Sequence, residues 1–146
     1  NRCGCKPRTE SAKMKTILDF NCIKNTIIEL AETHGISRQQ LIDCWNEETE
    51  ALDWSINYRN DLQKEFECDA EKLQAAINLY HAAIKNNDLL TAECALLDAG
   101  IWAHNLTNFF ENIKDDLKKA LIEKQQFNWP EIPEGYQIPK HYNYKN

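Results

Sequence analysis

The sequence predicts an all-α fold, an antiparallel up-down bundle of three long or four shorter helices followed by an extended C-terminal tail rich in proline and aromatic residues. Between Pro7 and Pro130 the chain has no proline and only two glycines, Gly35 and Gly100. About 120 consecutive residues therefore carry almost nothing that stops a helix. Apolar residues recur there at three- and four-residue steps, without the alternation typical of a strand.

The first helix is expected from Thr9 to His34, with Gly35 as its C-terminal stop. Its apolar stripe follows the helical period and is formed by Ile17, Phe20, Ile23, Ile27 and Leu30.

The second helical stretch opens with a capping-box pattern, Ser37 followed by Gln40. Its apolar residues keep one heptad register from Ile42 to Ile84, which predicts a single helix of about fifty residues. The one expected break is at residues 68–71, where Asp69 is placed to act as an N-cap.

A turn is expected at residues 86–88, because asparagine tolerates left-handed geometry and Asp88 can cap the next helix. That last helix is predicted to run to Gln126, with Gly100 inside it so that a neighbouring helix can approach closely. Short connections after Gly35 and Asn87 make neighbouring helices antiparallel.

The chain reads as a single domain in three parts: a basic leader or flexible N-terminus at 1–13, a helical bundle at 14–126 and an extended tail at 127–146. Two interpretations of the first part stay open. Either a signal peptide was removed ahead of Asn1, which favours an oxidising compartment, or Met14 is the native start, which favours the cytosol. The compartment is left unassigned, with the cytosol preferred to secretion. The apolar runs are too short for a membrane span.

The tail is punctuated by proline and cannot be helical. One interpretation is a strap whose Trp129, Ile132, Tyr136 and Ile138 pack along the bundle. The other is a polyproline-like peptide that is presented to a partner.

The six cysteines are sparse for a disulfide scaffold. Cys22, Cys44, Cys68 and Cys94 fall on the expected helices, and we interpret them as small buried apolar residues rather than two disulfides. Cys3 and Cys5 form a lone Cys-x-Cys motif, which is weak evidence for a metal site. We predict no metal.

No catalytic pattern is present in the sequence. The four histidines are scattered, and none follows a glutamate by three residues, so the Glu-x-x-His pattern of di-iron bundles is absent. Zinc-protease, nucleophile-elbow and phosphate-loop motifs are absent too. We predict a protein that is not an enzyme and has no cofactor.

Charge is the sharper signal. Residues 46–71 hold nine acidic and two basic residues, a balance of −7, while the whole chain carries −6. The single-helix register places on the outer side Glu47, Glu50, Asp53, Trp54 and Asp61. This pattern is typical of an aromatic anchor ringed by acids that steer a basic partner. The alternative is that a helix or the tail covers Trp54 and the acids form a solvated rim.

The sequence therefore predicts a small acidic helical binding protein that inhibits or regulates a basic protein partner by occlusion, as immunity proteins, antitoxins and phage inhibitors do. The predicted contacts are the five residues above with Trp129 and Tyr136. A secreted, disulfide-stapled protein that binds a small ligand or a host protein is the alternative, and a metal-binding enzyme is the third. An acidic face disfavours nucleic acid, and no membrane is expected as a partner. Long amphipathic helices leave a homodimer open.

Overall fold

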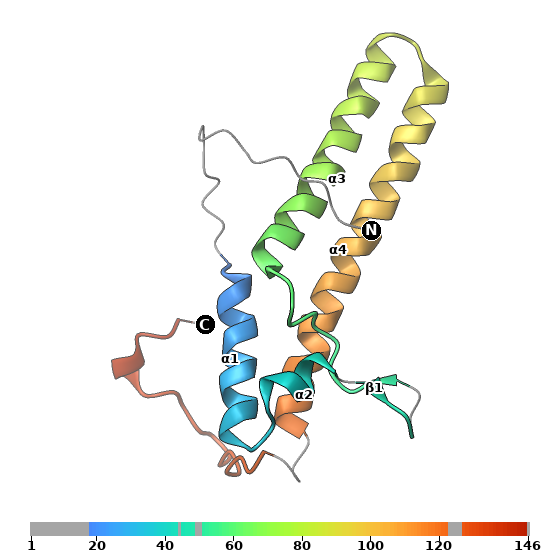
Figure 1. The fold of residues 1–146 in the computed structure, drawn as a ribbon. Coiled ribbons are helices and arrows are strands. Elements are labelled where there is room, and N and C mark those ends of the chain that lie inside the picture. Colours follow the sequence, from blue (N-terminus) through green and yellow to red (C-terminus); the bar gives the residue numbers. More distant parts are fainter. Residues whose placement is uncertain (1–17, 44, 49–50, 123–126, 146) are drawn as a thin grey trace.

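The computed structural model describes residues 18–43, 45–48, 51–122 and 127–145 (Figure 1). These residues form an all-α fold with one two-residue β ladder. The elements in chain order are α1 (Phe20–Thr33), α2 (Arg38–Ile42), β1 (Trp45–Asn46), β2 (Ala51–Leu52), α3 (Leu62–Lys85), α4 (Leu89–Ile122) and the 3-10 helix η1 (Lys140–Tyr142).

Helix α4 is the spine of the molecule. Its 34 residues span about 51 Å. Helix α3 packs antiparallel along its N-terminal part, and α1 lies beside its C-terminal part (Figure 1). The predicted antiparallel helical bundle is confirmed.

The predicted turns are also confirmed. Gly35, at φ +82°, follows α1, and Ser37 and Gln40 form the capping box of α2. Asn87 adopts φ +54°, and Asp88 accepts hydrogen bonds from the backbone N of Thr91 at 3.0 Å and from its Oγ1 at 2.6 Å.

The single helix predicted from Ile42 to Ile84 is wrong. Helix α2 ends at Ile42, and α3 begins at Leu62 with Asp61 as its N-cap. The break expected at 68–71 is wrong as well, because these residues lie inside α3. Trp54, Ile56 and Tyr58 alternate at two-residue steps and are buried from a non-helical segment that packs against the helices, so the helical register does not hold there.

The main core lies where α1, the first turns of α3 and the C-terminal half of α4 meet. The Phe20 ring is 4.6 Å from the Phe66 ring and 5.0 Å from the Phe109 ring, centroid to centroid. The helix expected from Thr9 begins at Phe20, with Asp19 as its N-cap. Residues 9–17 and 123–126 lie outside the described residues.

Two smaller expectations need correction. Cys22 and Cys94 are free and exposed, whereas Cys68 is buried and disulfide-bonded. A Cβ at Gly100 would meet nothing within 4 Å, so this glycine does not serve a close helix approach inside the chain. Across the described residues, no helix combines the length and the apolar character that a membrane crossing requires.

Candidate interaction surfaces

A buried carboxylate ties the non-helical segment to α4. Asp116 accepts hydrogen bonds from Ser55 N at 2.7 Å, Ile56 N at 2.9 Å and the Tyr58 hydroxyl at 2.6 Å, and it is 1% exposed. Burying a carboxylate is costly unless donors replace its water. These three donors do so, and they fix residues 54–58 on α4.

The expectation that Trp54 faces outward is wrong. Its side chain is 5% exposed. The Phe127 ring approaches it edge-on at 6.4 Å, and Lys119 Nζ lies 5.3 Å from its ring centroid. Trp54 is therefore a core residue, and the alternative that another part of the chain covers it is correct.

Two of the predicted acids do share one element. We call residues 45–53 the acidic loop: β1 and β2 pair antiparallel, with Trp45 opposite Leu52 and Asn46 opposite Ala51. This pairing puts Glu47 in the turn and Asp53 just after the ladder, and both are exposed. The ladder stands at the edge of the molecule (Figure 1). Glu50 lies outside the described residues.

Asp61 lies on a different element and has a structural task. Its Oδ1 accepts hydrogen bonds from Lys64 N at 3.1 Å, which caps α3, and from Asn21 Nδ2 at 2.8 Å, which ties α3 to α1. The Asn21 bond, followed by the Lys64 backbone bond, lowers the pKa of this carboxyl below its ordinary value of 3.8.

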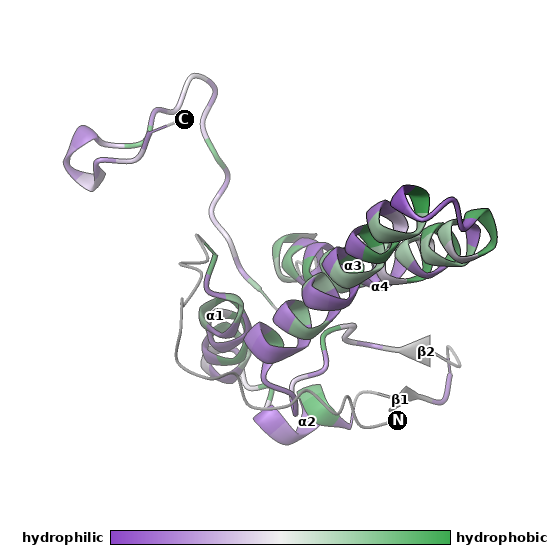
Figure 2. Cartoon of the chain, turned by 90° about the horizontal axis from the view of Figure 1, so that it is seen from above, coloured by the Kyte–Doolittle hydropathy of each residue, from purple (hydrophilic) through white to green (hydrophobic). Residues whose placement is uncertain are grey.

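The tail is a strap only at its start. Phe127 is buried, and Trp129 Nε1 donates to the Ala120 carbonyl at 2.8 Å while its ring stays half-exposed. Ile132, Tyr136 and Ile138 are exposed, so the strap predicted over these residues is wrong. Figure 2 shows the rest of the tail running away from the helices.

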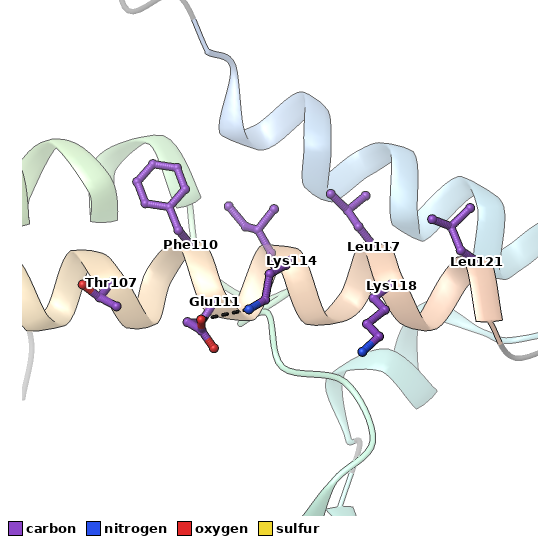
Figure 3. A pocket seen from close by; sticks show the side chains of 8 residues that line it. Thr107, Phe110, Glu111, Lys114, Leu117, Lys118 and Leu121 are labelled. Carbon is purple, nitrogen blue, oxygen red and sulfur yellow. Dashed lines mark hydrogen bonds and ion pairs between the residues drawn. The ribbon is translucent and has the colours of Figure 1, made fainter.

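A groove that the sequence interpretation missed lies on α4. It has a volume of about 850 Å³, and Phe110, Leu117 and Leu121 project into it from one side of the helix (Figure 3). At its rim Lys114 Nζ pairs with Glu111 Oε1 at 2.9 Å. The sequence signal for this groove is the seven-residue step from Phe110 to Leu117, which places both side chains on one side of the helix. All lining residues come from α4, so the groove is open rather than enclosed.

Metal-binding groups are absent from the part of the chain that the structure describes: it brings no three His, Cys, Asp or Glu side chains together as a ligand set.

Comparison with known proteins gives a family and a related fold. The model of a family described as "Family of unknown function (DUF6853)" matches residues 20–131. A crystal structure of a functionally unknown protein from Neisseria meningitidis MC58 is similar, with 25% sequence identity and a TM-score of 0.70. The match covers 78% of this chain and 98% of that one. No curated protein matches.

Proposed function

We propose that this chain, which belongs to the DUF6853 family of unknown function, is a non-enzymatic helical protein that binds a basic protein partner and inhibits or regulates it by occlusion. The observation that carries the proposal is the acidic loop, whose β1–β2 ladder stands at the edge of the molecule beside a segment that Asp116 anchors on α4.

The composition of the acidic loop indicates the sign of the charge on the partner's surface. Residues 45–53 contain four acidic residues and no basic residue. Such a patch attracts a cationic surface over several ångströms and speeds its encounter.

The tail supplies the apolar part of the proposed contact. Trp129 and Tyr136 are each more than half exposed. Aromatic side chains are enriched at the energetic centres of protein interfaces. Trp54, in contrast, has no place in the contact surface, because Phe127 and Lys119 already pack against it.

The alternative, a protein that binds a small ligand, draws on the α4 groove and on the disulfide at Cys68. Ligand sites usually surround most of the ligand surface. A groove lined by one helix is a weaker basis than the acidic loop, and protein binding is the function we favour.

The test is a charge reversal at the acidic loop, Glu47→Lys with Asp53→Lys. The matched control is Glu29→Lys with Glu32→Lys, two exposed acids of α1 that lie outside the acidic loop and the tail. Proteins captured by the wild-type chain and by each variant are compared by quantitative mass spectrometry. The affinity of the best captured protein is then measured at low and high salt. We expect a partner of high isoelectric point, at least a tenfold affinity loss in the loop variant and little change in the control.

Inhibition is measured on the same partner, because occlusion requires that its activity falls as the complex forms. A partner that binds the loop variant and the wild type equally well, with no salt dependence, would contradict the proposal.

A further inference from the structure

At the end of the α3–α4 hairpin that is far from α1, small side chains are buried between the helices and large apolar side chains are exposed. The side chains buried between the two helices there are alanines, with Ala76 and Ala83 on α3 facing Ala92, Ala95 and Ala99 on α4. Three large apolar side chains of α4 point outward instead: Leu90 is 73% exposed, Leu97 is 65% exposed and Ile101 is 56% exposed. Figure 2 shows hydrophobic residues, in green, on this end of the hairpin.

Helix α4 is apolar nearly all round over this stretch. Between Leu89 and Ala103 it carries two charged side chains, Glu93 and Asp98. A helix that is apolar on every side is normally a buried one. Here α3 covers only one side.

The side of α4 that faces away from α3 is covered near the C-terminal end of the helix and exposed near its N-terminal end. Ile101 and Lys119 are five turns apart and therefore lie on one line of the helix. Lys119 lies against Trp54 of the anchored segment. Above that contact, the same side of α4 carries Ile101, Leu97 and Leu90 without a cover among the described residues.

We define the tip surface as the outward apolar residues of this end, namely Ile84, Leu89, Leu90, Leu96, Leu97 and Ile101. Their exposed fractions add up to about three and a half fully exposed leucine-sized residues, roughly 700 Å². The largest apolar patch on a typical monomer is about 300–600 Å². A specific, stable interface buries about 600–1,000 Å² on each partner, so the area of the tip surface lies within the range that a stable dimer needs.

We propose that the tip surface binds a second copy of this chain, so that two α3–α4 hairpins form a four-helix bundle around a two-fold axis. Two other occupants from the chain itself fit less well. Residues 1–17 hold only two large apolar side chains, Met14 and Ile17. The tail leaves α4 at its opposite end (Figure 1).

The polar side chains on this side of α4 favour an antiparallel pair. Glu93 and His104 are three turns apart and lie on one line of the helix, on either side of Leu97. A two-fold axis at the midpoint of the two, level with residues 98 and 99, brings Glu93 of one copy opposite His104 of the other, twice. Gly100 then has a use, because its open side lets the second helix approach closely.

The first test is the mass of the full chain in solution, measured by light scattering and sedimentation from about 1 to 100 μM. We expect twice the 17.0 kDa of one chain. Leu97→Glu with Ile101→Glu should give the monomer with unchanged helicity, because both side chains point away from α3. Ile132→Glu, at an exposed apolar residue of the tail, should remain a dimer. A wild-type monomer at the highest concentration, or a folded double variant that still dimerises, would overturn the proposal.

A second measurement needs no variant. Cys94 lies between Leu90 and Leu97 on α4, whereas Cys22 is on α1, and both thiols are free and exposed in the single chain. Alkylation of Cys94 in the wild type should slow at least tenfold between the monomeric and the dimeric concentration range, while Cys22 reacts at one rate. If Cys94 reacts at the same rate in both ranges, the tip surface is not the dimer interface.

Discussion

The carboxylate of Asp116 joins α4 to a segment about sixty residues earlier in the chain. Removing it in Asp116→Ala leaves two backbone N–H groups and the Tyr58 hydroxyl without their acceptor. Unsatisfied buried donors cost about 1–3 kcal/mol each. We expect the free energy of unfolding to fall by at least about 3 kcal/mol, as measured by urea titration.

Asp115→Ala is the control for this variant. Asp115 is the preceding residue on the same helix and is exposed, so its loss should change the free energy of unfolding by less than about 0.5 kcal/mol. Equal effects of the two substitutions would contradict the role of Asp116 in holding residues 54–58 on α4. The sequence does not distinguish the two aspartates directly. A weak signal is that Asp116 follows Ile113 by three residues and precedes Ala120 by four, which places it on the buried side.

At the scale of elements, short sequence patterns correctly predicted the helix ends and turns that depend on neighbouring residues alone. The end of α1, the capping box of α2 and the Asn87 turn all follow from a few neighbouring residues, and the structure has each of them. The segment between α2 and α3 was mispredicted, because Trp45, Leu52 and Ile56 repeat at spacings that a helix satisfies. The buried residues Trp54, Ile56 and Tyr58 instead alternate at two-residue steps, as in an extended segment. What holds them is Asp116, a partner that no local pattern reveals.

The candidate site was likewise predicted only where a local sequence pattern was sufficient. Acid density in the sequence identified the loop that carries Glu47 and Asp53, and it survives as the basis of the proposed function. The placement of Trp54 on the outer side did not survive, because it depended on the helix that is absent. The α4 groove was missed because a seven-residue step such as that from Phe110 to Leu117 is also typical of a buried bundle core, whereas each of the two side chains is 43% exposed.

The tail divides energetically at Trp129. Phe127→Ala should lower the free energy of unfolding by about 3–5 kcal/mol, since its ring is 1% exposed and packs against His34 and Trp54. Truncation after Pro130 should leave the thermal midpoint nearly unchanged, because the residues beyond it are exposed. Calorimetry of the two proteins distinguishes the cases. A large loss on truncation would restore the strap interpretation.

At the scale of the whole molecule, the chain has two parts, which we call the foot and the arm. The foot is well packed, whereas the apolar surface of the arm is incompletely covered. The foot joins α1, the anchored segment and the C-terminal half of α4 around large aromatic and aliphatic side chains. The arm pairs α3 with α4 through alanines, which bury little apolar area. The two functions proposed above use different parts: the acidic loop at the foot faces a basic partner, and the arm faces a second copy.

This division predicts how backbone amides exchange with solvent. In a single chain the amides of residues 89–103 should exchange through local opening, faster than those of residues 109–120 in the foot. A second copy on the tip surface stabilises the arm by mass action, so its exchange should slow at least tenfold from about 1 to 100 μM while the foot is unaffected. Hydrogen exchange with mass spectrometry measures both regions in one sample. In Leu97→Glu with Ile101→Glu the arm should exchange fast at both concentrations, and a wild-type arm that is equally protected at both would contradict the two-part description.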